Sequence, residues 1–197
     1  VGCISVTANI APKHCSNFQN FSENVQKFGS KFSEIKNNEI NWKEREEELK
    51  KNLKKYTNAS DNYKVIVPVS GGKDSTWQVY VAKNILKLTP LAVTFDQFDQ
   101  TDTGIHNLKI LREIGVDHIH ITINPKIIKK LVRKGLELIG DPYWVNHVGM
   151  FTAPINIATK FQIPIVMYGE NPQFEYGGPK ENRHQMIMDK RWRQEFS

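Results

Sequence analysis

A short run of serine, glycine, lysine and aspartate is the part of this chain best suited to chemistry. It reads Ser70-Gly71-Gly72-Lys73-Asp74-Ser75-Thr76 and lies between an apolar run and a helical pattern. A strand that enters a helix through adjacent glycines directs backbone N–H groups and the positive end of the helix at one point. Hydroxyl groups and an ammonium group add further donors there. The run therefore predicts an anion site, and we expect the anion to be a polyphosphate.

The spacing of this loop separates it from the G-x-x-x-x-G-K-[ST] loop, because its glycines are adjacent and Asp74 follows Lys73. The string S-G-G-K-D-S resembles the signature of the PP-loop ATP pyrophosphatases. That resemblance implies a loop that binds ATP, cleavage between the α and β phosphates, and transfer of AMP to a carbonyl-type oxygen before a nucleophile displaces it. The alternative is a surface turn rich in glycine and serine, and the order of strand, loop and helix argues against it.

The region that begins at Lys64 alternates short β-branched runs with helical patterns. This alternation predicts an α/β fold with an open parallel sheet and helices on both faces, and the resemblance implies a fold like that of the adenine nucleotide alpha hydrolases. The expected strands are 64–69, 91–95, 118–122 and 164–168. The expected helices are 75–87, 107–114, 125–136 and 152–161.

Asn41 is the expected N-cap of a further, amphipathic helix that begins at Trp42. We therefore expect an N-terminal extension over 1–60 that contains this helix. A nucleotide-binding domain over 61–178 and a charged tail over 179–197 would follow. The resemblance implies that this domain is incomplete at its C-terminal end.

Polar residues follow the expected strands at their carboxyl ends, where ligands bind in parallel sheets. A carboxylate beside bound phosphates requires a cation between them, which implies Mg²⁺ near Asp74 or Glu170. Asp96 either contacts the ribose or adenine of a nucleotide or forms a turn, and both readings stay open. The expected nucleotide-binding residues are Ser70, Gly71, Gly72, Lys73, Ser75, Thr76, Thr94, Phe95, Asp96, Gly169 and Asn171. The expected catalytic residues are Lys73, Asp74 and Glu170.

Four segments extend the resemblance to one branch of the superfamily: 67–76, 91–96, 115–119 and 169–178, the last reading G-E-N-P-Q-F-E-Y-G-G. They look like the N-acetyl sugar amidotransferases of lipopolysaccharide and pseudaminic acid biosynthesis. This resemblance implies that ATP adenylates the N-acetyl oxygen of a sugar or sugar nucleotide. Ammonia from a separate glutaminase subunit then displaces AMP and leaves an acetamidino group.

The two cysteines are too few for the paired C-x-x-C segments with which that family opens. Cys3 and Cys15 cannot by themselves close a tetrahedral site, so we expect no zinc, and their role stays open. Two cysteines also make no disulfide framework.

The first residues do not resemble a signal peptide and no apolar run spans a bilayer, so we expect a cytoplasmic protein without membrane contact.

Two further functions stay open. Its net charge of +6 comes largely from two basic runs, around 50–55 and 126–134. These runs would suit a PP-loop enzyme that modifies tRNA, but no RNA-binding module is recognisable, so we expect no nucleic acid partner. An inactive nucleotide-binding fragment is the other alternative. The sequence leaves the sugar, the glutaminase and the oligomeric state undetermined.

Overall fold

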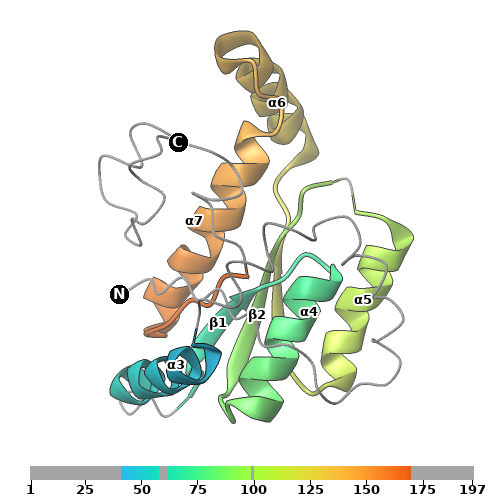
Figure 1. Ribbon diagram of the computed structural model, residues 1–197. Helices are drawn as coiled ribbons and strands as arrows, with labels where there is room; N and C mark the ends of the chain where they lie inside the picture. Colours follow the sequence, from blue (N-terminus) through green and yellow to red (C-terminus); the bar gives the residue numbers. More distant parts are fainter. Residues whose placement is uncertain (1–40, 58–61, 99, 170–197) are drawn as a thin grey trace, which may run out of the picture. The chain divides into compact units, whose positions relative to one another are not determined.

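The computed structural model describes residues 41–57, 62–98 and 100–169 (Figure 1). The chain divides into two compact units. The described residues up to Lys55 belong to one unit, and those from Tyr56 onward belong to the other. The second unit holds the sheet and all the described residues of the predicted site.

The first unit contributes most of helix α3 (Trp42–Thr57). The predicted N-cap is confirmed, because Asn41 Oδ1 accepts a hydrogen bond from the Glu44 N–H at 3.3 Å. Two ion pairs lie on the helix surface, Arg45–Glu48 at 3.0 Å and Lys50–Glu46 at 2.6 Å. Exposed pairs of this kind contribute a few tenths of a kcal/mol each, roughly.

The sheet of the second unit is parallel, as the sequence predicts. It contains β1 (Val65–Pro68), β2 (Pro90–Phe95) and β3 (Asp117–Ile121) in the order β1-β2-β3. In its register, Ile66 lies beside Leu91, and Leu91 lies beside Asp117. Parallel strands direct all their carboxyl ends to one edge, so the loops that follow β1 and β2 lie next to each other.

The fourth predicted strand, 164–168, is shorter than expected. It forms a single parallel bridge between Val166 and Ile66. The Ile66 N–H donates to Ile165 O and the Met167 N–H donates to Ile66 O, both at 2.8 Å. Pro68 lies two residues after Ile66 on the same side of β1 and has no N–H to donate to this segment, so the ladder does not extend. The bridge still places this segment beside β1, on the side away from β2, so β1 lies in the interior of the sheet.

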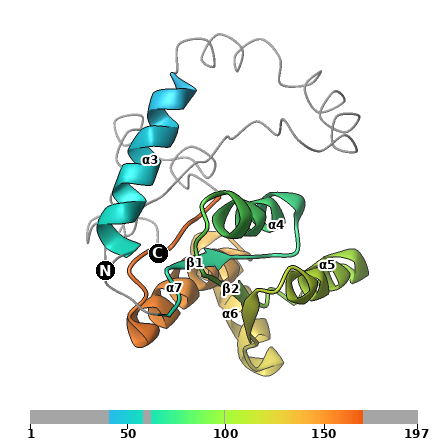
Figure 2. The ribbon, with the colours of Figure 1, turned by 90° about the horizontal axis from the view of Figure 1, so that it is seen from below.

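Helices cover both faces of the sheet, which confirms the predicted architecture. Figure 2 shows α4 and α5 on one side of the strands and α7 on the other. The helices are α4 (Lys73–Tyr80), the π-helix η1 (Val81–Ile85), α5 (Asp102–Glu113), α6 (Pro125–Ile139) and α7 (Trp144–Phe161). None of them combines the length and the apolar composition that crossing a bilayer requires.

Helix α4 begins two residues before its expected start, at Lys73, and two other helices begin much earlier than their patterns predict. Helix α5 begins at Asp102, because the Thr101 side chain caps it by accepting from the Gly104 N–H at 3.1 Å. The first turn of α5 is polar, so the apolar periodicity of the sequence did not predict this start. Helix α7 begins at Trp144, eight residues before the expected start at 152. Pro154, a residue that usually ends a helix pattern, lies inside α7 and obscured its length.

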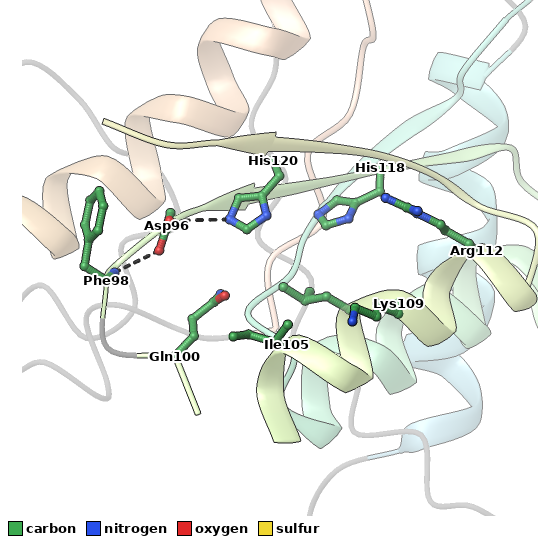
Figure 3. Close-up of a pocket in the computed structure, with 9 residues that line it drawn as sticks. Asp96, Phe98, Gln100, Ile105, Lys109, Arg112, His118 and His120 are labelled. Atoms are coloured by element: carbon green, nitrogen blue, oxygen red, sulfur yellow. Dashed lines mark hydrogen bonds and ion pairs between the residues drawn. The ribbon is translucent and has the colours of Figure 1, made fainter. Parts of the chain in front are cut away.

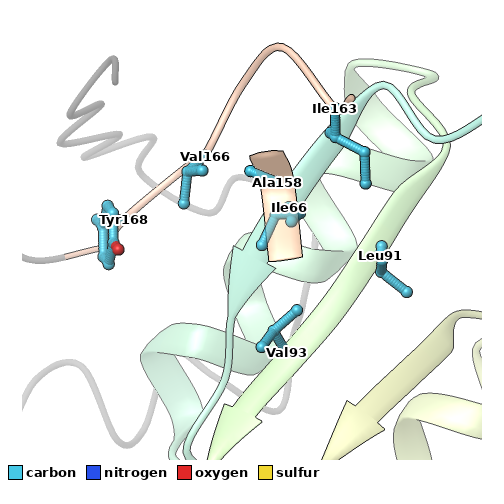
Figure 4. Close-up of a cluster of buried hydrophobic side chains, with 7 residues drawn as sticks. All are labelled: Ile66, Leu91, Val93, Ala158, Ile163, Val166 and Tyr168. Carbon is cyan, nitrogen blue, oxygen red and sulfur yellow. The ribbon is translucent and has the colours of Figure 1, made fainter. Parts of the chain in front are cut away.

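The main core lies between the sheet and α7 (Figure 4). Its buried members come from β1, β2, α7 and the segment after α7: Ile66, Leu91, Val93, Ala158, Ile163, Val166 and Tyr168. A smaller cluster joins the end of β2 to α6 and α7 through Phe95, Ile128 and Val145. Both clusters fix the strands whose carboxyl ends carry the predicted site.

Candidate phosphate-binding site

The predicted phosphate loop joins β1 to α4 in the structure. Gly71 has a φ of +83°, a conformation that favours glycine, and the extended Gly72 is the N-cap residue of α4. No side chain of the described residues caps this helix. The first N–H groups of α4 are therefore left to water or to a ligand, and an anion is the ligand that they favour.

The hydroxyl groups of the loop bond within it. Ser75 Oγ accepts from the Ser70 N–H at 3.3 Å and donates to Gly72 O at 3.2 Å. Thr76 Oγ1 also donates to Gly72 O, at 2.9 Å. These bonds hold the turn in shape. A phosphate that is bound by either hydroxyl would have to replace one of these contacts, so the predicted nucleotide-binding role of Ser75 and Thr76 stays a prediction.

Lys73 and Asp74 form an ion pair at the start of α4. Lys73 Nζ lies 2.8 Å from Asp74 Oδ1, and the two side chains are 52% and 81% exposed. An exposed pair of neighbouring residues contributes little to stability. Both groups are thus available to a nucleotide, the ammonium to a phosphate and the carboxylate to a cation.

Helix α5 supports the loop, a relationship that no sequence pattern predicted. Asn107 Nδ2 donates to Gly71 O at 2.8 Å. A Cβ on Gly71 would overlap the carbonyl oxygen of Gly104 and lie 2.9 Å from its carbon. The loop and the first turns of α5 therefore pack backbone against backbone. One sequence signal could have predicted the earlier start of α5. Thr101 is a residue type that caps helices, and Gly104 lies three residues later, where the capped N–H is expected.

The predicted residues at the end of β2 lie in different surroundings. Thr94 is buried, and its Oγ1 donates to Val69 O at 2.7 Å, which ties the ends of β1 and β2 together. The Phe95 ring packs in the smaller core cluster. Asp96 forms a turn, because its Oδ1 accepts from the Phe98 N–H at 2.9 Å. The turn reading of Asp96 is thus observed, and its carboxylate lines a groove between α5 and β3 (Figure 3).

The end of the fourth segment is described only as far as Gly169. A Cβ on Gly169 would overlap the amide group of Gln78, a buried residue of α4. The glycine thus permits close packing against α4. Glu170 and Asn171 lie outside the described residues, so the structure leaves their predicted roles untested.

The described residues contain no group of three His, Cys, Asp or Glu side chains that could enclose a metal ion. Asp74 offers one exposed carboxylate at the loop. Magnesium that arrives with nucleotide phosphates needs only one or two protein carboxylates, since phosphates and water supply its other ligands. Asp74 therefore fits the predicted role, and Glu170 stays a prediction.

Comparisons with known proteins agree with the parallel α/β fold described above. The family model for NAD synthase matches residues 45–137, which include the loop, β1, β2 and β3. The NH3-dependent NAD synthetase from Campylobacter jejuni superimposes with a TM-score of 0.52 at 14% identity, over 68% of this chain and 58% of that one. The fold is the NAD synthetase fold.

The glutamine-dependent NAD+ synthetase from Acinetobacter baumannii, solved with ADP, superimposes with a TM-score of 0.50 at 17% identity. The alignment covers 63% of this chain and 25% of that enzyme. This chain thus spans less than two thirds of either synthetase. No protein of curated function matches its sequence.

Proposed function

We propose that this chain binds ATP at the loop over 70–76 and uses it to adenylate the N-acetyl oxygen of a sugar or sugar nucleotide. That oxygen attacks the α-phosphorus and pyrophosphate leaves. Ammonia then adds to the activated carbon, and AMP leaves with the oxygen. The products are an acetamidino sugar of surface polysaccharide biosynthesis, AMP and pyrophosphate.

One observation carries the ATP-binding part of this proposal: the uncapped N-terminus of α4 behind the Gly71-Gly72 turn. Backbone N–H groups there face any bound anion without a Cβ between them. Lys73 adds a positive charge that would stabilise the departing pyrophosphate. Asp74, with Glu170, would hold the Mg²⁺ that ATP carries.

Ammonia as the nucleophile is supported by the fold. One synthetase of this fold is NH3-dependent and another is glutamine-dependent. We therefore propose that a separate glutaminase subunit supplies ammonia to this chain. The sugar acceptor rests on the resemblance of the segment 169–178 to the N-acetyl sugar amidotransferases.

The proposal is tested by measuring pyrophosphate release from ATP with ammonium and a panel of N-acetyl sugar nucleotides. We expect release that depends on the acceptor, and a product in which the N-acetyl oxygen is replaced by an imino nitrogen, seen by mass spectrometry. Lys73→Ala and Gly72→Val should each weaken ATP binding strongly. Lys126→Ala removes an exposed lysine on α6 and serves as the matched control. Equal ATP affinity in all three variants would refute the phosphate-loop assignment.

A second candidate is NAD synthesis itself, because the NAD synthase family model matches residues 45–137. An assay coupled to a NAD-dependent dehydrogenase separates the two candidates. NAD formed from its immediate precursor, ATP and ammonium would favour the second. ATP binding without turnover of any acceptor would favour the inactive fragment.

A further inference from the structure

A concave region distinct from the phosphate loop lies between α5 and β3, at the edge of the described sheet (Figure 3). Its volume is about 400 Å³, a size typical of small-molecule sites. We call it the α5–β3 groove. Its polar lining residues are Asp96, Gln100, Lys109, Arg112, His118 and His120.

The described lining of the groove carries more positive than negative charge. Lys109 and Arg112 carry permanent charges, and neither forms an ion pair with a carboxylate of the described residues. Among the described lining residues Asp96 is the one with an acidic side chain, and it lies near His120, with Oδ2 3.9 Å from Nε2. A concave site with unpaired cations attracts anions and discriminates against cations.

The hydrogen bond of the His118 ring determines which of its two nitrogens can contact a ligand. His118 Nε2 lies 2.8 Å from Thr94 Oγ1, whose own proton is donated to Val69 O. Thr94 therefore accepts from His118, which places a proton on Nε2. No described residue bonds Nδ1, so this nitrogen remains to accept a proton or, once protonated, to donate to an anion.

We propose that the α5–β3 groove binds a small phosphomonoester, with the phosphate held by Lys109, Arg112 and His118. The two permanent cations match the charge of a phosphate dianion, and a guanidinium can bond two phosphate oxygens at once. Asp96 and Gln100, at the other end of the lining, can bond the hydroxyl groups of a polyol or sugar skeleton. The proposal does not depend on the reaction proposed above, because the groove uses neither the loop nor α4.

The test follows the Cε1–H resonance of His118 by NMR in the full chain, assigned with His118→Gln. N-Acetylglucosamine 1-phosphate is the probe and uncharged N-acetylglucosamine is its counterpart. We expect a saturable shift with the phosphorylated sugar only. Equal shifts with both sugars, or no saturable shift with either, would overturn the proposal.

Two variants locate the phosphate within the groove. Arg112→Met and Lys109→Met should each weaken binding about tenfold or more, since each removes a charged donor. Arg133→Met makes the same change on the exposed side of α6 and should leave binding unchanged. Two separate positions keep the test informative if one variant fails to fold.

The phosphate loop is the competing site for this probe. Gly72→Val should abolish ATP binding there while it leaves the His118 response intact. Loss of the response in Gly72→Val would assign the bound phosphate to the loop and overturn the proposal.

The pKa of His118 offers an independent readout. Burial, together with the charges of His120 and Arg112, lowers this pKa below its ordinary value. The charged and titratable groups that line the groove with His118 are Lys109 and Arg112 from α5, His120 from β3 and, at the other end of the lining, Asp96. A bound phosphate would raise the pKa of His118, so its titration midpoint should move up with the phosphorylated sugar. An unmoved midpoint at saturation would contradict direct contact.

Discussion

Asn107 holds the carbonyl oxygen of Gly71 through a 2.8 Å hydrogen bond from its side-chain amide. One residue lies on α5 and the other in the turn that opens α4. The bond fixes the orientation of a peptide group whose neighbouring N–H groups would face a bound phosphate. The phosphate loop is thus shaped partly by a helix that follows the next strand.

Asn107→Ala should therefore weaken ATP binding severalfold with only a small loss of stability. The part-buried Gly71 carbonyl would lose one hydrogen-bond donor, a change worth about 0.5–1.5 kcal/mol. Isothermal titration with ATP and urea unfolding measure the two effects. His106→Ala changes an exposed neighbour on the same helix and should alter neither. Equal ATP affinity of Asn107→Ala and the parent chain would show that the bond does not shape the loop.

Gly71→Ala should unfold far more easily than Gly140→Ala. Both glycines have positive φ, +83° and +73°, so both substitutions carry a backbone penalty of about 1–2 kcal/mol. The added Cβ meets the Gly104 backbone at position 71 and open space at position 140. The difference between the two unfolding free energies therefore isolates the packing of the loop on α5. Similar values for both variants would refute that contact.

Gly149→Ala should destabilise the chain, although alanine normally favours helix over glycine by about 1 kcal/mol. The added Cβ would overlap the buried Phe95 ring. Overpacking of a core typically costs about 1–3 kcal/mol. Phe95→Leu should recover part of the loss, so a double-mutant cycle in urea measures the coupling. Strict additivity of the two changes would mean that the ring moves away freely.

His118 should make the folded chain less stable as the pH falls below about 6.5, the ordinary histidine pKa. The folded-state pKa is lowered, so between these two values the unfolded chain binds a proton that the folded chain does not. Stability is then complete above pH 6.5 and is lost as the pH falls toward the lowered value. His118→Gln should show a shallower loss between pH 7 and 5 in thermal unfolding. His106→Gln, an exposed change, should keep the parent slope.

The sequence alone determined the elements and the loop, because both are local. The apolar run over 65–69, the adjacent glycines and the Asn41 cap each act within a few residues, where backbone preference decides the outcome. The parallel α/β class followed from the same alternation of strands and helices. The starts of α5 and α7 were misjudged because a polar first turn and an internal proline weaken the helical pattern.

Only the tertiary structure determined which residues surround the phosphate loop and which side chains line the α5–β3 groove. Asn107 and Gly104 reach the loop from more than thirty residues away along the chain, and no local pattern encodes that approach. His118 and Arg112 likewise meet in one groove because α5 packs along β3. Contacts between distant segments depend on how the buried faces of the helices and the sheet fit together, and the fold as a whole sets that fit.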